Sequence, residues 1–259
     1  MNERTITVAD TSIYIRESAA TDESLPTLLC IHGNLGSGRW FEHVIDAYPG
    51  RAVAPDMPNF GQSDHIDDWS MAAYANWIRA IADALGTEQA VILGHSLGGA
   101  VAMELLASHP QLVERLILVD SSPIDGLFTP KEHYPAIEAY KADKAILAQA
   151  LKTVVPMIKD EALFAQLVDD AWKMNRDCFI GHAEELGKAD FTSRLQGASV
   201  PVHVLRGAHD ILITEERAQR LADHLGGTLD TFATSGHSPM VEVPEEFALK
   251  VTTLLRTGA

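Results

Sequence analysis

The chain has 259 residues, of which 46% are hydrophobic and 22% charged, a composition typical of a soluble globular protein and not of a disordered chain. It carries 36 acidic and 20 basic residues, and the net charge of −16 disfavours binding to nucleic acids or anionic membranes. The sequence contains no apolar run of membrane-spanning length, no signal-peptide pattern and only two cysteines. We therefore expect a cytoplasmic protein with no nucleic-acid or membrane partner.

The first 122 residues alternate short β-rich runs with helical patterns. The runs typical of strands occupy residues 5–8, 13–17, 27–32, 51–55, 90–93 and 113–119, and the first two predict a hairpin. The helical patterns occupy residues 38–48, 71–85 and 97–109. Gly86 and Pro110 end the second and third of these helices.

From residue 123 to residue 195 the pattern is helical throughout, after which alternation resumes. The final part predicts strands at 202–205 and 229–232, and helices at 214–225 and from Pro244 onwards. Strands separated by helices predict an α/β fold with a mostly parallel, doubly wound sheet of about eight strands. We predict a core formed by residues 1–122 and 196–259, with residues 123–195 inserted as a helical cap. Because open α/β sheets bind ligands at the carboxyl ends of their strands, the cap would roof the site.

The sequence Gly-His-Ser-Leu-Gly-Gly at residues 94–99 lies between a predicted strand and a predicted helix. It fits the pattern G-x-S-x-G, in which the glycines permit a tight turn that exposes the serine hydroxyl. At the start of the following helix, the backbone N–H of Leu97 would point into the site, where it can stabilise an oxyanion. We predict that Ser96 is a nucleophile.

A serine hydroxyl is a poor nucleophile unless a base accepts its proton, and the base needs an acid to orient it. After a G-x-S-x-G turn these partners follow in the order acid, then histidine. Asp210 lies just beyond the predicted strand 202–205, and His237 lies between the last predicted strand and the last helix. We predict Asp210 as the acid and His237 as the base.

Further motifs extend this pattern along the chain. They are HGNLGS at 32–37, DxxxxGxS at 56–63, GxxD at 207–210 and HxxxxExP at 237–244. With the serine motif, they make the chain resemble the α/β-hydrolase-fold enzymes, in particular cap-bearing serine esterases, over nearly its whole length except the helical block. The resemblance implies a catalytic triad of Ser96, Asp210 and His237. It also implies an oxyanion hole formed by the backbone N–H groups of Asn34 and Leu97.

Several residues around this triad have more than one interpretation. Some relatives place the triad acid at the position of Asp120, which therefore stays open as an alternative to Asp210. Asn59 stands where many relatives have glycine, and because asparagine tolerates positive φ we expect the turn to persist. Glu242 is expected to brace the final loop. The residues preferred as the lining of a substrate pocket are Phe128, Met240, Tyr134 and Trp172, from a wider set that also contains Trp40, Phe60, Tyr140 and Phe179.

The predicted function is hydrolysis of a small-molecule carboxylic ester through an acyl-enzyme, without a metal or organic cofactor. A carbon–carbon bond hydrolase, lactonase, thioesterase or cofactor-free perhydrolase would use the same site. Ser96 argues against haloalkane dehalogenases and epoxide hydrolases, which resemble this chain but use a carboxylate nucleophile. A small-molecule receptor that retains the triad is an alternative of a different class. The oligomeric state is left open, with a homodimer among the alternatives.

Overall fold

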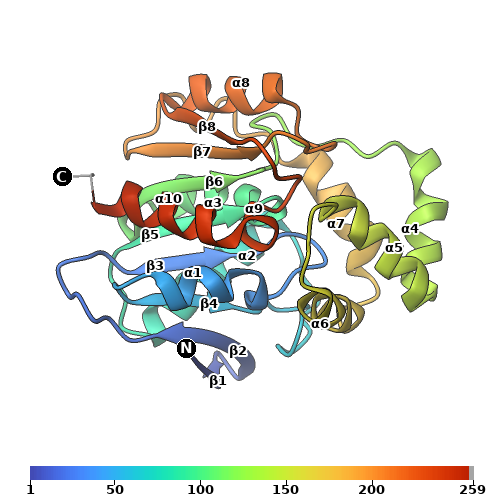
Figure 1. Ribbon diagram of the computed structural model, residues 1–259, viewed down its shortest axis with the longest axis horizontal. Helices are drawn as coiled ribbons and strands as arrows, with labels where there is room; N and C mark the ends of the chain where they lie inside the picture. The colour runs from blue at the N-terminus through green and yellow to red at the C-terminus, as the bar shows by residue number, and fades with distance from the viewer. Residues whose placement is uncertain (257–259) are drawn as a thin grey trace.

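A central sheet of eight strands dominates the computed structural model, which describes residues 1–256 (Figure 1). The strands are β1 (Asn2–Val8), β2 (Thr11–Ser18), β3 (Leu28–Ile31), β4 (Ala52–Pro55), β5 (Ala90–His95), β6 (Val113–Val119), β7 (Val202–Gly207) and β8 (Thr228–Phe232). Their order across the sheet is β1-β2-β4-β3-β5-β6-β7-β8. Strand β2 pairs antiparallel with β1 and β4, and the other neighbours are parallel. The mostly parallel sheet predicted from the sequence is confirmed.

Helices cover both faces of this sheet (Figure 1). They are α1 (Glu42–Ala47), α2 (Met71–Ala84), α3 (Leu97–Ser108), α8 (Glu215–Leu225), α9 (Pro239–Glu242) and α10 (Pro244–Arg256), with 3-10 turns η1 (Gly38–Phe41) and η2 (Pro110–Leu112). One apolar layer contains residues of α2, α3 and α8, and the other contains residues of α1, α9 and α10. On β5, Ile92 faces the first layer while Val91 and Leu93 face the second, as the two-residue period of a strand requires. No helix within residues 1–256 is long and apolar enough to cross a membrane.

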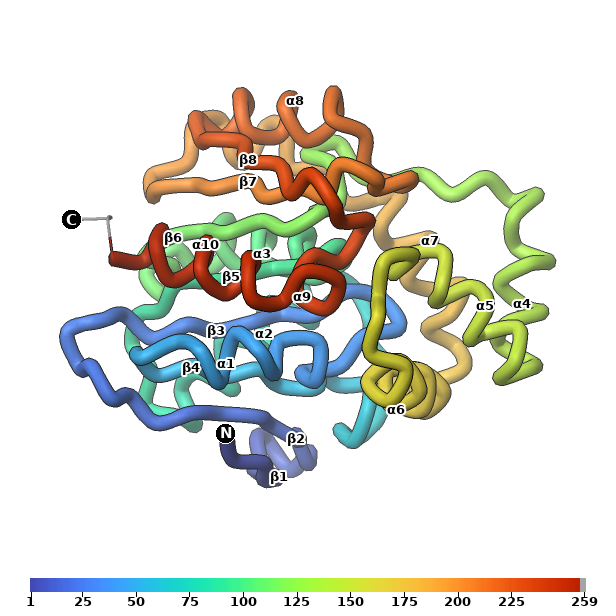
Figure 2. The backbone as a smooth tube through the Cα atoms, viewed as in Figure 1, coloured from blue at the N-terminus to red at the C-terminus, as the bar shows by residue number. Residues whose placement is uncertain are grey.

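The chain between β6 and β7 forms a helical group at one end of the sheet, drawn from green to pale orange in Figure 2. It contains η3 (Lys131–His133), α4 (Tyr134–Ala142), α5 (Lys144–Val154), α6 (Glu161–Trp172) and α7 (Cys178–Lys188). The two ends of this insertion are joined by hydrogen bonds, in which the N–H groups of Leu127 and Phe191 donate to the carbonyls of Leu186 and Ile124. We call residues 123–195 the cap, using the boundaries predicted from the sequence.

Two local details differ from the sequence-based expectation. The helix expected at 38–48 is divided into η1 and α1, and a Cβ at Gly38 would lie only 2.3 Å from the carbonyl oxygen of Ala54. The chain therefore lies against β4 at Gly38 and forms a 3-10 turn there, where the start of a continuous α-helix was expected. The loop after His237 contains the short helix α9, which the sequence pattern did not predict. Asn59 has φ of +75°, so the expected positive-φ turn is present.

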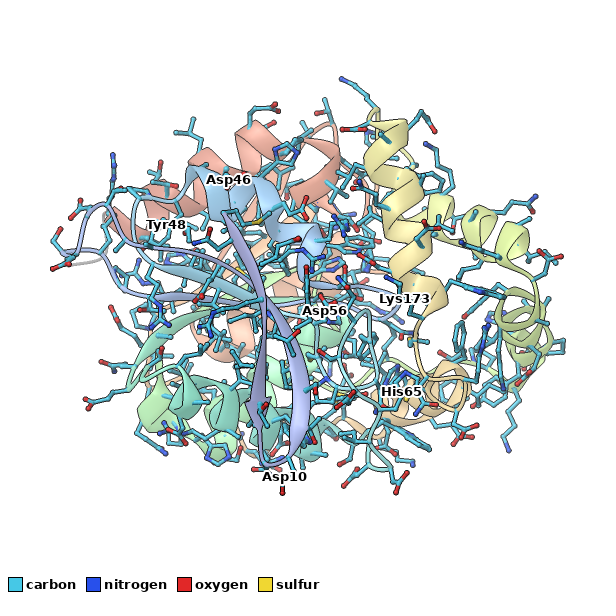
Figure 3. All side chains as sticks on the ribbon, turned by 90° about the horizontal axis from the view of Figure 1, so that it is seen from below. Asp10, Asp46, Tyr48, Asp56, His65 and Lys173 are labelled. Carbon is cyan, nitrogen blue, oxygen red and sulfur yellow. The ribbon has the colours of Figure 1, made fainter. Side chains whose placement is uncertain are left out.

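A buried ion pair organises the side of the core that faces the cap. Asp56 follows β4 and Arg16 lies on β2, and neither side chain is exposed to solvent. One Asp56 oxygen accepts hydrogen bonds from Arg16 Nη1 at 2.8 Å and from the Gly38 N–H at 2.8 Å. Arg16 also lies within 4.0 Å of Asp170 on α6, to which Lys173 is paired, and Figure 3 labels Asp56 and Lys173 in this region. Asp56 therefore balances a buried positive charge at the cap–core boundary.

Asp56→Ala is expected to lower the free energy of unfolding by about 3–5 kcal/mol, because it leaves the buried guanidinium of Arg16 without its closest counter-charge. Urea denaturation would measure the change. Asp83→Ala serves as the control, since Asp83 pairs with Arg79 on the exposed face of α2 and should change stability by less than about 1 kcal/mol. Equal effects of the two substitutions would contradict the structural role assigned to Asp56.

Candidate active site

Ser96 lies at a sharp turn between β5 and α3. Its backbone has φ of +53° and ψ of −116°, a conformation that a non-glycine residue adopts only under strain. As the residue before α3, Ser96 stands next to backbone N–H groups that have no acceptor within the helix, starting with that of Leu97. The turn therefore sets a hydroxyl beside the positive end of a helix.

The glycines of the motif are needed because backbone segments approach one another closely at this turn. A Cβ at Gly94 would lie 2.5 Å from the carbonyl oxygen of Gly98. At Gly98 a Cβ would lie 2.2 Å from the carbonyl oxygen of Ile31 on β3. These neighbours are backbone atoms and cannot move aside, so the sequence pattern is explained by packing of α3 against the ends of β3 and β5.

The structure brings His237, Asp210 and Asp120 together at the ends of three strands. His237 Nδ1 lies 2.8 Å from Asp210 Oδ2, and the second oxygen of Asp210 accepts from the Leu212 N–H at 2.7 Å. Asp120 follows β6, is buried, and accepts a hydrogen bond from the Gly207 N–H at 3.0 Å. Ligand-type atoms of Asp120, Asp210 and His237 all lie within 4.8 Å of one another. Among residues 1–256, these three side chains are also the group placed closely enough to hold a metal ion.

The two carboxyl groups have opposite protonation behaviour. Burial alone would raise the pKa of Asp210, but the hydrogen bond and charge of His237, with a hydrogen bond from Asp120, lower this pKa to about 2. Burial and the adjacent negative charge of Asp210 raise the pKa of Asp120 well above its usual range. Two adjacent buried carboxyl groups cannot both ionise without a large cost in free energy. Asp120 therefore stays protonated and donates a hydrogen bond to ionised Asp210.

A cavity of about 250 Å³ opens onto Ser96 and His237. Ser96, His95 and His237 form part of its wall, with Asn34 and Leu35 from the loop after β3. The remaining lining residues are Trp40, Tyr140, Ala150, Thr153, Val154 and Leu212. Within residues 1–256 the Ser96 side chain makes no hydrogen bond.

None of the four preferred pocket residues lines this cavity, whereas Trp40 and Tyr140 from the wider set do. Phe128 is 76% exposed and lines a separate surface cavity with Arg217 and Arg220. Met240 is fully buried in the core. Tyr134 and Trp172 pack on the other apolar layer. Proximity in sequence to the cap entry or to His237 did not predict which residues line the cavity. The orientation of α4, α5 and α9 about their axes decides which of their side chains reach it.

Asn34 is held by a cap residue that the sequence analysis did not single out. His182 on α7 is fully buried, and its Nδ1 lies 2.9 Å from Asn34 Oδ1. Its Nε2 lies 2.8 Å from the hydroxyl of Tyr74 on α2. Burial lowers the pKa of His182 to about 3, so the ring is neutral. Since an amide oxygen only accepts, the neutral ring donates from Nδ1 to Asn34 and accepts from Tyr74. Helix α7 therefore fixes the loop after β3.

His95 contacts the backbone of the loop that carries His237. Its Nε2 donates to the His237 carbonyl oxygen at 2.9 Å, and its ring stacks on Trp40 with a centroid separation of 5.5 Å. Burial and the nearby His237 lower the pKa of His95 to about 3, which keeps the ring neutral. His95 thus lines the cavity and braces the backbone at His237.

The model of the α/β hydrolase fold family matches residues 26–156, about half of the chain. The chain belongs to this family. The matched α/β hydrolase segment includes the loop after β3, the turn at Ser96 and Asp120.

Relatives and solved structures agree with this assignment. The chain is 29% identical to an sn-1-specific diacylglycerol lipase of Mus musculus over 90% of this chain and 82% of that protein. It is 26% identical to a lipase of Mycobacterium tuberculosis over 88% of this chain and 92% of that protein. Among structures, an esterase from Exiguobacterium antarcticum has a TM-score of 0.85 and 21% identity, covering 98% of this chain and 99% of that chain. An enol-lactonase from Burkholderia xenovorans has a TM-score of 0.86 and 19% identity, covering 98% and 100%.

Asp120→Asn is expected to flatten the pH dependence of stability. The folded protein keeps a proton on Asp120 that the unfolded chain releases above about pH 3.9, so wild-type stability falls as pH rises from there towards the raised pKa, by up to about 1.4 kcal/mol per pH unit. Asparagine does not titrate and removes this contribution. Urea denaturation of both proteins from about pH 4 upwards would measure the two slopes, and parallel curves would show that Asp120 is not held protonated.

Proposed function

We propose that this α/β hydrolase cleaves small carboxylic esters through an acyl-enzyme formed on Ser96. The observation that carries the proposal is one cavity in which a serine at a strained strand–helix turn shares the wall with a histidine already paired to a buried carboxylate. Esterases and lipases among the relatives and structural neighbours support the same reaction class.

The proposed reaction follows from the hydrogen bonds around His237. Because Nδ1 donates to Asp210, Nε2 carries the lone pair and can accept the proton of Ser96 as the hydroxyl attacks the ester carbonyl. The N–H groups of Leu97 and Asn34 then hold the oxyanion, each contributing about 2.7–4 kcal/mol in comparable sites. His237 returns the proton to the departing alcohol, and water repeats the sequence on the acyl group.

The cavity favours a compact and uncharged substrate. Its volume is about 250 Å³, below the usual size range of sites for drug-sized ligands. Leu35, Ala150, Val154 and Leu212 give it an apolar wall, and no lysine, arginine or carboxylate among residues 1–256 lines it. We therefore propose short acyl and small alcohol groups. A panel of p-nitrophenyl esters of increasing length, with lactones and diketones beside them, tests this choice: highest turnover on lactones or diketones would replace the ester assignment.

Ser96→Ala and His237→Ala should each abolish ester hydrolysis, and the double variant should be hardly worse than either, because triad residues act as a unit. Steady-state rates on a p-nitrophenyl ester measure the losses. A fluorophosphonate probe should label wild type at Ser96 and fail to label Ser96→Ala. Multiplicative losses, or labelling that persists in Ser96→Ala, would place the nucleophile elsewhere.

Asp210→Asn should cost about 10⁴ in turnover, because an amide can hold the wrong imidazole tautomer. Asp120→Asn should keep turnover within roughly threefold, since an asparagine NH₂ can replace the carboxylic O–H as the donor to Asp210. Turnover of the two isosteric variants on one ester makes the comparison. A crippled Asp120→Asn beside a mild Asp210→Asn would transfer the acid role to Asp120.

Asn34→Ala should keep activity within roughly tenfold, about 1.4 kcal/mol, because the proposed oxyanion donor is a backbone N–H that alanine also has. It should nevertheless lower the free energy of unfolding by about 1–3 kcal/mol, since buried His182 loses its acceptor. Turnover and urea denaturation of the same preparation measure both effects. A thousandfold loss of turnover in a folded variant would make the side-chain amide a catalytic donor.

A further inference from the structure

Glu242 is a buried carboxylate that the reaction above does not use. It ends α9, five residues after His237, and is 5% exposed. Its Oε2 accepts hydrogen bonds from the Gly236 N–H at 2.7 Å, the Ser235 hydroxyl at 2.9 Å and the Ser238 N–H at 3.3 Å. One carboxylate oxygen therefore gathers the residues on both sides of His237. We call residues 235–238 the base loop.

The other oxygen of Glu242 bonds to the cap. Oε1 accepts from the Met157 N–H at 2.7 Å, in the connection between α5 and α6. Two further contacts join the same segments: the Ser238 hydroxyl donates to the Val154 carbonyl at 3.3 Å, and Pro156 lies against Gly236. We call residues 154–157 the cap turn. Glu242 thus divides its two oxygens between the base loop and the cap turn.

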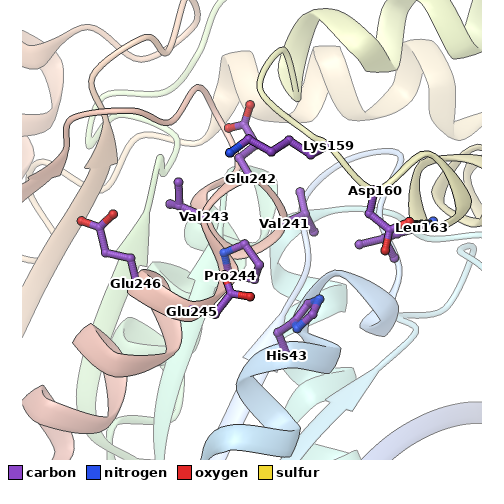
Figure 4. Close-up of a pocket in the computed structure, with 10 residues that line it drawn as sticks. All are labelled: His43, Lys159, Asp160, Leu163, Val241, Glu242, Val243, Pro244, Glu245 and Glu246. Atoms are coloured by element: carbon purple, nitrogen blue, oxygen red, sulfur yellow. Dashed lines mark hydrogen bonds between the residues drawn. The ribbon is translucent and has the colours of Figure 1, made fainter.

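The space beside this link is hollow. A cavity of about 450 Å³ lies between the cap and the core, with Glu242 in its wall (Figure 4). The cap contributes Lys159, Asp160 and Leu163, and the core contributes His43 and the start of α10. Val155 and Ile158 belong to the same buried apolar cluster as Met240 and Val241, so the hydrogen bonds of Glu242 add directional links to a packed contact between the cap turn and the base loop.

We propose that Glu242 is a positioning residue that fastens the base loop to the cap turn, so that the placement of His237 depends on how the cap is seated. The proposal rests on the proposed role of His237 as the base. It makes the cap part of the catalytic geometry as well as a roof over the cavity. Displacement of the cap turn would move the base loop, and with it His237, relative to Ser96.

Glu242→Gln tests the link with little change in shape. Glutamine has one acceptor oxygen, so it can retain the bond from the cap turn or the bonds from the base loop but not both sets. We expect kcat to fall by roughly tenfold to a hundredfold, as for a small misplacement of a catalytic group, with KM changed less than about threefold. Glu245→Gln is the matched control, because Glu245 lines the same cavity on an exposed position, and it should leave both constants unchanged.

A compensating pair separates positioning from simple loss of structure. A Cβ at Gly236 would lie 2.7 Å from Pro156 Cδ and 2.8 Å from Pro156 Cγ, so Gly236→Ala should push the cap turn away from the base loop. Gly236 lacks a positive φ, which permits alanine there. Pro156→Ala removes both ring atoms. We expect Gly236→Ala to lower kcat at least roughly tenfold, and Gly236→Ala with Pro156→Ala to recover most of that loss.

The outcomes distinguish this proposal from the function on which it rests. If His237→Ala stays active, the assignment of the base fails whatever the Glu242 variants do. If His237→Ala is inactive, full kcat in folded Glu242→Gln overturns the positioning role. If His237→Ala is inactive and the variant with both Gly236→Ala and Pro156→Ala is as slow as Gly236→Ala alone, the placement of His237 does not depend on the cap turn. A rescued double variant together with a kcat-specific loss in Glu242→Gln supports it.

Discussion

The close contact between the start of α3 and the end of β3 is the constraint on which the site depends. Gly98 lies where any Cβ would strike the carbonyl oxygen of Ile31, so the helix can approach the sheet only with glycine there. At this approach Ser96 has positive φ and stands directly before the first N–H groups of α3 that lack an acceptor within the helix. Ser96, the N-terminus of α3 and Asn34 therefore meet at one cavity.

Buried carboxyl groups lie at the ends of three other strands, and the charge of each is compensated in a different way. Asp56 neutralises Arg16, Asp210 is ionised beside His237, and the raised pKa of Asp120 reflects a retained proton. A buried unpaired charge would be costly, so each carboxyl must keep its own partner or its own proton. The local charge of the site is therefore set by contacts within the fold, despite the net charge of −16 on the whole chain.

Besides apolar packing, polar contacts join the cap to the core on two sides of the cavity. His182 bonds to Asn34 on one side, and the cap turn bonds to Glu242 on the other. Between these points lie the cavity over Ser96 and the hollow seam shown in Figure 4. These two links allow the position of the cap to influence both the proposed oxyanion loop and the proposed base.

The sequence by itself determined the strand order along the chain, the mostly parallel sheet and the turn at Ser96, because two-residue and helical periods and glycine spacing are local signals. It also predicted Asp210 and His237, whose chain order reflects the order of the strands. Only the tertiary structure decided which candidate residues line the cavity: Trp40 and Tyr140 do, and Phe128 and Met240 do not. It also decided the His182–Asn34 and Glu242–Met157 contacts. These depend on the rotation of cap helices about their axes and on partners 85 or more residues away, which no local pattern encodes.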